Sequence, residues 1–147
     1  MTPKLLPPVW FALSAFVMWL LAKIPFVALP HAPWLAVILA AAGLAIAAIA
    51  LLAFLRAGTT ADPRDPAQSR HLVTHGIYRV SRNPMYLGMA LILAAWAIWL
   101  AHPLAWPGIA GFVFAITRWQ ILPEERILEG KFGASYRAYR QQTRRWL

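Results

Sequence analysis

Four long apolar segments, separated by shorter polar ones, follow one another along the chain. They cover about residues 9–29, 34–55, 84–101 and 104–122. A helix that crosses a hydrocarbon core of about 30 Å needs about 20 apolar residues, which is close to the length of each segment. The second segment carries no charged residue, and the fourth is interrupted near its end by Thr117, Arg118 and Gln120. The pattern predicts an all-α polytopic membrane protein, with residues 1–147 as one domain of four transmembrane helices.

The second apolar segment also carries small residues at helical spacing. Ala41 is four residues before Ala45, and Gly43 is four residues before Ala47. In lipid, small residues allow a neighbouring helix to approach closely, because apolar side chains gain nothing by leaving lipid for each other. We therefore expect this segment to pack against another helix.

Composition and charge placement agree with this topology. Of the 147 residues, 61% are hydrophobic and 13% are charged, which is more apolar than an ordinary soluble domain. If the chain crosses four times, all lysines and arginines except Lys23 lie on one side. The positive-inside rule then places both termini and the loop 56–83 in the cytoplasm, with the protein in a prokaryotic plasma membrane. We expect the first segment to be retained, because it lacks a small-x-small cleavage site.

The net charge of +9 raises the question of a nucleic-acid partner. No groove-reading or base-stacking motif accompanies the charge, and a basic face beside anionic headgroups explains it more simply. We expect contact with membrane lipids and no nucleic acid. The chain has no cysteine and four scattered histidines, so we also expect no metal site. The oligomeric state is left open.

Two polar regions lie on the predicted cytoplasmic side. The loop 56–83 contains turn-forming proline, glycine and aspartate, but it is too apolar for plain disorder and is therefore predicted to be functional. It ends at Asn83, where Pro84 is predicted to begin the third helix. Residues 123–146 begin with Pro123 and two glutamates and then alternate apolar with basic residues. This pattern predicts a C-terminal amphipathic helix at the membrane surface.

Three stretches of these regions carry a family resemblance. They are "GTT" at 58–60, "LVTHGIYRVSRNPMYLG" at 72–88 and "PEERILEGKFGASYRAYRQQTRRW" at 123–146. Together they resemble the small prokaryotic members of the isoprenylcysteine carboxyl methyltransferase family, which is related to the membrane phospholipid methyltransferases. The resemblance covers about the last two thirds of the chain. It implies an integral-membrane methyltransferase that uses S-adenosyl-L-methionine and a lipophilic or lipid-tailed acceptor.

The resemblance also implies where the cofactor binds. In the family it is held by the segment leading into Leu-Val-Thr, the tyrosine after Gly-x, the Arg-His-Pro-x-Tyr turn and a glutamate of the Glu-Glu pair. The matching positions are Arg70, His71, Leu72, Val73, Tyr78, Asn83, Pro84, Met85, Tyr86 and Glu124. Tyrosine rings can stabilise the sulfonium cation of the cofactor, and a glutamate can bind its ammonium group.

Two positions differ from the motifs of the eukaryotic family members in ways that affect the chemistry. Asn83 stands where the eukaryotic motif has histidine, so that position can hydrogen-bond but cannot titrate. Gln120 stands where eukaryotic members have a substrate-binding arginine, and the nearby Arg118 and Arg126 are the candidates for positioning the acceptor. The acceptor group could be a carboxylate, an amine or a thiol.

Other interpretations stay open at this stage. Glu124 and Glu125 could serve only to stabilise the start of a helix. The enzyme could be a phospholipid amine N-methyltransferase. The chain could also be a non-catalytic membrane scaffold or an assembly subunit.

Overall fold

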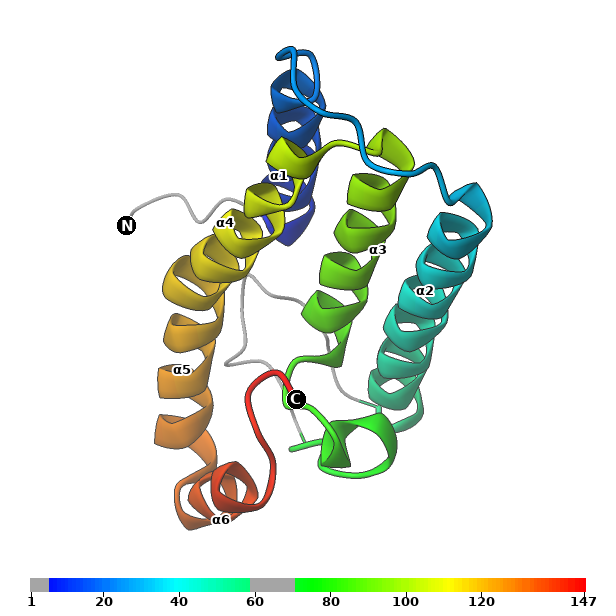
Figure 1. The fold of residues 1–147 in the computed structure, drawn as a ribbon. Coiled ribbons are helices and arrows are strands. Elements are labelled where there is room, and N and C mark those ends of the chain that lie inside the picture. Colours follow the sequence, from blue (N-terminus) through cyan, green and yellow to red (C-terminus); the bar gives the residue numbers. More distant parts are fainter. Residues whose placement is uncertain (1–5, 59–70) are drawn as a thin grey trace.

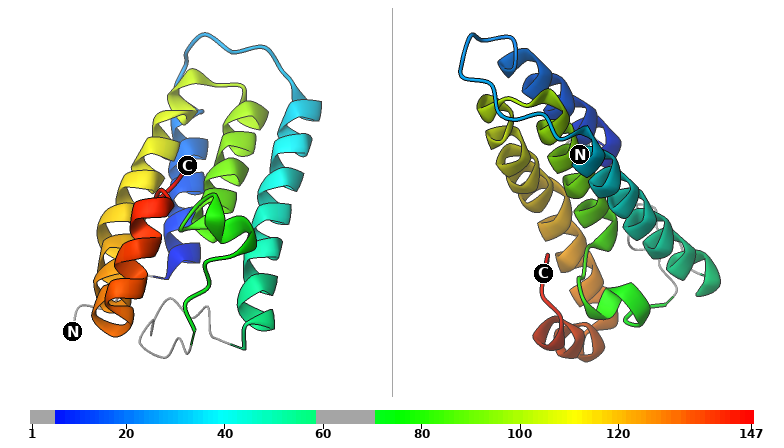
Figure 2. Two further views of the ribbon diagram at one scale, coloured as in Figure 1. Left: turned by 90° about the horizontal axis from the view of Figure 1, so that it is seen from below. Right: turned by 45° about the vertical axis from the view of Figure 1, so that its right-hand side comes forward.

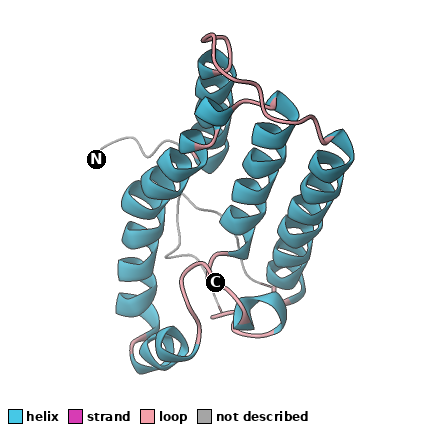
Figure 3. Ribbon diagram, viewed as in Figure 1, coloured by secondary structure: helices cyan, strands magenta, loops and turns pink. Residues whose placement is uncertain are grey.

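The structure, a computed structural model, describes residues 6–58 and 71–147, and all regular structure in these residues is helical (Figure 3). The prediction of an all-α protein is confirmed. Helices α1 (Pro7–Leu21), α2 (Pro33–Arg56), α3 (Pro84–Leu100) and α4 (Pro107–Ile116) run alternately up and down (Figure 1). Each begins at a proline. Proline is suited to this position because the backbone N–H groups of the first helical turn have no partner within the helix, and the proline ring fixes φ near the helical value.

The first helix is shorter than the sequence predicts. A helix was expected over residues 9–29, but α1 ends at Leu21 and residues 25–32 are non-helical. Pro25 and Pro30 explain the difference, because proline inside a helix removes a hydrogen bond and clashes with the preceding turn. The extended segment is held instead by a backbone hydrogen bond from Leu29 to Ala101.

The fourth helix is longer than predicted, and it does not restart at Pro123. α4 continues through a π-helical turn, η4 (Thr117–Ile121), into α5 (Leu122–Phe132). Ile121 and Leu122 both keep right-handed helical backbone angles. Because Pro123 donates no backbone hydrogen bond, a widened turn directly before it accommodates the proline without ending the helix.

The amphipathic helix predicted over residues 123–146 is broken into two. α5 ends at Gly133, whose positive φ of 52° ends the helix. α6 (Ala134–Gln142) then follows, and residues 143–147 form no regular helix. The prediction of one continuous helix is therefore wrong, although both parts are helical and α6 is amphipathic.

Among the described helices, α2 is the one whose length and apolar composition suffice to cross a membrane. It has 24 residues, whereas α1 and α3 are apolar but shorter. The four crossings predicted from the sequence therefore stay a prediction.

The bundle is held together by α3, which contacts α1, α2 and α4. The buried residues of α2 are Ala36, Gly43 and Ala50, spaced by seven, so one narrow face of α2 lies on α3. A Cβ atom at Gly43 would lie 2.7 Å from the carbonyl oxygen of Gly88, so the two backbones are in direct contact. The close helix packing predicted from the small residues of this segment is confirmed.

One end of the bundle gathers segments that are far apart in sequence. The loop before α3, including η2 (Gly76–Arg79), lies beside α6 and the residues that follow it (Figure 2). A hydrophobic cluster joins them through buried residues of α2, the loop and α6, namely Ala50, Val73, Tyr78, Tyr136 and Tyr139. The loop region described from residue 71 onward is thus a packed part of the fold.

Candidate functional site

A polar cluster connects the start of α3 with the helix formed by η4 and α5. The hydroxyl of Tyr86 donates a hydrogen bond of 2.8 Å to Oε1 of Glu124. The side-chain amide of Gln120 donates to the same oxygen, across 2.5 Å. Tyr86 and Gln120 are both buried. The half-buried carboxylate of Glu124 therefore accepts from two neutral donors, one on α3 and one four residues earlier on its own helix.

The π turn explains how Gln120 reaches this cluster. Its wider backbone turns side chains away from the positions that a regular α-helix would give them. Within η4, Gln120 is 2% exposed while its neighbours Arg118 and Trp119 are exposed. The turn thus directs the amide inward and the guanidinium outward.

A second cluster surrounds Glu125, the residue after Glu124 in α5. Glu125 accepts a hydrogen bond of 2.9 Å from Arg82 and two bonds, of 2.9 and 2.8 Å, from Arg145. Burial alone would raise the pKa of Glu125, but the hydrogen bonds and charges of Arg145 and Arg82 lower it below its usual value. The glutamate is therefore ionised at neutral pH and ties the loop, α5 and the segment after α6 together.

The loop residues next to Arg82 also hold the backbone that follows α6. Ser81 and Asn83 each donate a side-chain hydrogen bond to the carbonyl oxygen of Arg145, at 3.3 and 3.0 Å. Arg82 donates from its guanidinium to the carbonyl of Thr143 at 2.7 Å. The Asn83 amide thus contacts protein backbone, which is compatible with the predicted hydrogen-bonding role of this position but uses one of its donors.

Buried tyrosines form the other side of this region. The hydroxyl of Tyr139 donates to the carbonyl of Tyr78 at 2.7 Å, and the ring of Phe54 meets that of Tyr78 edge to face. Burial, reinforced by Tyr139 and Glu124, raises the pKa of Tyr78 well above its usual value. Burial likewise raises the pKa of Tyr136 to about 12. These tyrosines are neutral at physiological pH and rigidly packed.

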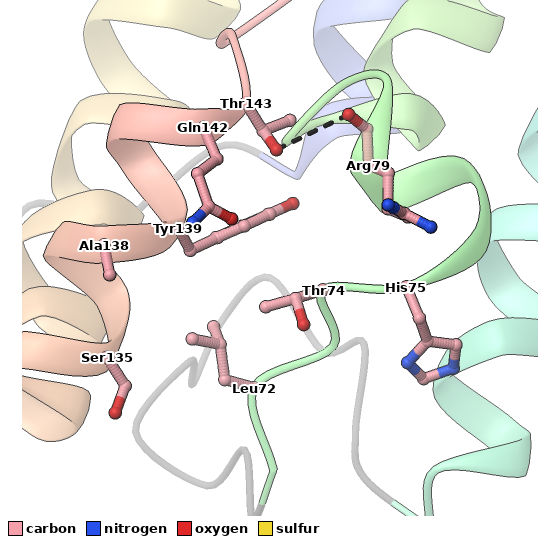
Figure 4. Close-up of a pocket in the computed structure, with 9 residues that line it drawn as sticks. All are labelled: Leu72, Thr74, His75, Arg79, Ser135, Ala138, Tyr139, Gln142 and Thr143. Carbon is pink, nitrogen blue, oxygen red and sulfur yellow. Dashed lines mark hydrogen bonds between the residues drawn. The ribbon is translucent and has the colours of Figure 1, made fainter.

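A cavity of about 710 Å³ opens between the loop and α6 (Figure 4). Figure 4 shows the loop residues on one side and the α6 residues on the other, with the hydroxyl of Thr143 bonded to the carbonyl of Arg79 at 3.5 Å between them. The lining residues are Leu72, Thr74, His75, Arg79, Ser135, Ala138, Tyr139, Gln142 and Thr143. The lining offers hydroxyls, an amide, an imidazole and a guanidinium beside apolar surface, which suits a polar organic ligand.

Comparison with known proteins identifies the family. A family model described as phospholipid methyltransferase matches residues 31–135. This chain belongs to the phospholipid methyltransferase family. The resemblance inferred from the motifs is thereby confirmed, and a membrane methyltransferase is the activity that the family supports.

Two relatives can be described. An uncharacterized protein of Haemophilus influenzae is 52% identical over 63 residues, which are 43% of this chain and the full length of that protein. Protein-S-isoprenylcysteine O-methyltransferase A of Arabidopsis thaliana is 32% identical over 72 residues, which are 49% of this chain and 36% of the plant protein. No solved structure matches the chain.

The structure brings some of the predicted cofactor residues together and separates others. Tyr86 and Glu124 are in contact, and Leu72 lines the cavity. Val73, Tyr78 and Pro84 are buried, Met85 packs beside the cluster of Val73 and Tyr78, and His71 is exposed. Arg70 lies outside the described residues. The predicted acceptor residues Arg118 and Arg126 are both exposed and do not line the cavity.

Sequence reasoning missed the residues that hold the site together. Arg82 and Glu125 stand next to predicted site residues, yet Arg82 and Arg145 were assigned no role and Glu125 only a possible role in stabilising the start of a helix. Their motif positions gave a signal, since the arginine belongs to the Arg-Asn-Pro-x-Tyr turn and the glutamate to the Glu-Glu pair. Sequence alone gave no indication that the two motifs meet through these charges.

Proposed function

We propose that this protein is an integral-membrane methyltransferase that uses S-adenosyl-L-methionine and transfers a methyl group to a lipophilic acceptor. The observation that carries the proposal is the hydrogen bond between Tyr86 and Glu124. It joins two of the motifs that the family resemblance assigns to the cofactor, although they are 38 residues apart in sequence. Family membership supports the reaction class, while the cofactor and the acceptor are our assignment.

The residues present fit such a cofactor. The cavity of about 710 Å³ lies within the range of about 300 to 1,000 Å³ that is usual for small-molecule sites. We assign the adenosine part to this cavity, where Thr74, Ser135 and Gln142 can hydrogen-bond to ribose and base. When bound, S-adenosyl-L-methionine supplies a methyl group activated by the positive sulfur.

Tyr78 connects the cavity with the polar cluster. Its carbonyl accepts from Tyr139, which lines the cavity, and its side chain is close enough to Glu124 for the carboxylate to affect its pKa. We assign the amino-acid end of the cofactor to this cluster, where the carboxylate of Glu124 can bind an ammonium group. The rings of Tyr78 and Tyr86 can stabilise the sulfonium, and their packing keeps donor and acceptor aligned and water excluded.

The acceptor is proposed to reach the site from the bilayer, with its polar head held by Arg118 or Arg126. Both guanidinium groups are exposed on the helix formed by η4 and α5. A charge near the end of an apolar helix is stable if it reaches the interface or an anion, and lipid phosphate is an anion available there. With the predicted topology, we assign the active site to the cytoplasmic face of the plasma membrane.

One observation favours a phospholipid amine as the acceptor over a carboxylate. Gln120, at the position of the substrate-binding arginine of eukaryotic members, is buried and donates its amide to Glu124. That position therefore offers a neutral amide next to a carboxylate, and a negatively charged acceptor would be repelled there. An amine acceptor must lose a proton before it reacts, so its methylation rate should rise with pH.

The proposal is tested with the whole protein in nanodiscs, supplied with labelled S-adenosyl-L-methionine and lipid extract. We expect S-adenosylhomocysteine to form only when lipid is present, and mass spectrometry to identify the methylated lipid. Tyr86→Phe and Glu124→Gln should weaken cofactor binding by about ten- to a hundredfold, because each loses a charge-assisted hydrogen bond. Glu129→Gln, which removes only an exposed ion pair, is the matched control. A scaffold protein would neither bind the cofactor nor form product.

A further inference from the structure

The segment after α6 turns back toward the start of α3 and is fixed there. The backbone N–H of Arg82 donates to the carbonyl of Arg144 at 3.0 Å, and Asn83 and Ser81 both bond to the carbonyl of Arg145. The side chain of Arg145 adds its paired bonds to Glu125. Paired guanidinium–carboxylate bonds to a buried glutamate fix a backbone more firmly than single exposed contacts do. Residues 143–145 are therefore held in one place relative to α3 and α5.

The residue after this anchor is Trp146. Its indole N–H donates to the hydroxyl of Thr117 at 3.2 Å, and its ring packs against the core cluster that includes Tyr86, Ile116 and Ile121. Tyr86 is in the first turn of α3, and Thr117 is the first residue of η4. The indole thus bonds to η4 and packs against the cluster that contains Tyr86, the partner of Glu124.

The ring is only partly buried, so one part of it contacts the core and another part is accessible. Its single polar atom is already bonded to Thr117, and the remainder of the side chain is an apolar surface. An apolar surface beside a buried reactive site, at the edge of apolar helices, suits the hydrocarbon part of a ligand whose polar part enters the site.

We propose that Trp146 is a positioning residue that determines acceptor specificity, forming the wall along which the apolar chain of the acceptor lies. The inference rests on the proposed function, because it takes the Tyr86–Glu124 pair as part of the reaction site. The anchoring of residues 143–145 makes this wall fixed. It aligns the acceptor through its chain, while the adenosine part of the cofactor is held in the cavity between residues 72–79 and α6.

The test uses the whole protein in nanodiscs with two pairs of probe acceptors that differ in chain length. One pair is dihexanoyl and dioleoyl phosphatidylethanolamine, and the other is N-acetyl-S-geranylcysteine and N-acetyl-S-farnesylcysteine. Wild-type protein should prefer the longer member of the pair that it methylates. Trp146→Ala should raise the KM of the longer acceptor about tenfold and remove the preference, as expected when an aromatic contact is lost. The KM of S-adenosyl-L-methionine should be unchanged.

Conservative and control variants separate positioning from folding. Trp146→Phe keeps a smaller aromatic wall and loses the bond to Thr117, so it should retain most of the chain-length preference. Trp106→Ala removes an exposed tryptophan that directly precedes α4, whose first turn lies at the end of the bundle opposite α6 (Figure 1), and it should behave as wild type. If Trp146→Ala does not fold, Trp146→Leu keeps an apolar side chain and should raise the acceptor KM by a smaller factor, about two- to fivefold.

A failure of the proposed function can be distinguished from a failure of the role proposed for Trp146. If wild-type protein methylates none of the four probes and forms no product with lipid extract, the proposed function is wrong and the role of Trp146 fails with it. If wild-type protein is active and Trp146→Ala and Trp146→Leu both keep its chain-length preference, Trp146 is only a packing residue. An equal rise in the KM of cofactor and acceptor would also overturn the inference, because it indicates a general loosening of the site.

Discussion

Arg82 and Glu125 form an ion pair of 2.9 Å although only 7% and 8% of their side chains are exposed. Arg82 is in the loop before α3 and Glu125 is in α5, and the residue next to each is a candidate site residue, Asn83 and Glu124. A buried pair of this kind contributes little net stability compared with an apolar contact, but breaking it is costly. Its main effect is therefore to fix how the turn before α3 is positioned relative to the Glu-Glu pair of α5.

We expect Glu125→Gln to destabilise the protein strongly. The substitution leaves the guanidinium of Arg82 buried without a counter-charge, and such a change typically costs about 3 to 5 kcal/mol. The matched control is Glu129→Gln, whose partner Arg140 is 3.4 Å away with both side chains exposed. That variant should change stability by less than about 1 kcal/mol. Thermal unfolding in one detergent compares the two, and equal melting temperatures would contradict the importance of the buried pair.

The same ion pair predicts how stability depends on pH. The pKa of Glu125 is lowered in the folded protein from a usual value of 4.5, so its stabilising effect is present above that value. The effect is lost as the pH falls through the lowered pKa, because the glutamate then takes up a proton. Melting temperatures of wild type and Glu125→Gln should differ at neutral pH and converge in strong acid, below the lowered pKa of Glu125. A difference that persists unchanged into strong acid would show that charge is not its cause.

The contact between α2 and α3 requires glycine at Gly43 and Gly88. A Cβ atom at either residue would lie 2.7 or 2.6 Å from the carbonyl oxygen of the other, and backbone atoms cannot move aside. We expect Gly43→Ala and Gly88→Ala each to lower the free energy of unfolding by about 1 to 3 kcal/mol. In Gly111→Ala the new methyl group meets nothing within 4 Å, and the better helix propensity of alanine should leave the protein as stable or slightly more stable.

Cysteine labelling can test the predicted topology, since the chain has no cysteine of its own. His31 precedes α2 at one end of the bundle and Gln141 is exposed on α6 at the other (Figure 1). With both termini in the cytoplasm, a membrane-impermeant maleimide added to intact cells should label His31→Cys. It should label Gln141→Cys only after permeabilisation. Labelling of both variants from outside would rule out the predicted orientation.

The amino-acid sequence by itself determined the helices and the family. Periodicity and proline positions are local properties, so the start of α3 at Pro84 and the packing face of α2 around Gly43 could be predicted directly. The order of the motifs was sufficient to indicate the family, which the match over residues 31–135 confirms. The ends of the helices were harder to predict, because proline does not always stop a helix. α1 ends before Pro25, whereas α5 contains Pro123.

Only the tertiary structure decided which polar residues meet. The sequence left a role at the start of a helix open for Glu125 and gave Arg145 no role, because charged residues in a basic, amphipathic stretch are usually solvated. In the folded chain the two are paired across 20 residues of sequence, and Glu125 also binds Arg82, 43 residues away. Trp146 was predicted to continue a helix, but the break at Gly133 and the charges on Glu125 bring it instead to Thr117. Such long-range pairing depends on how the helices pack and on which side chains are buried, because burial raises the free-energy cost of an unpaired charge. A local sequence pattern encodes neither the packing nor the burial.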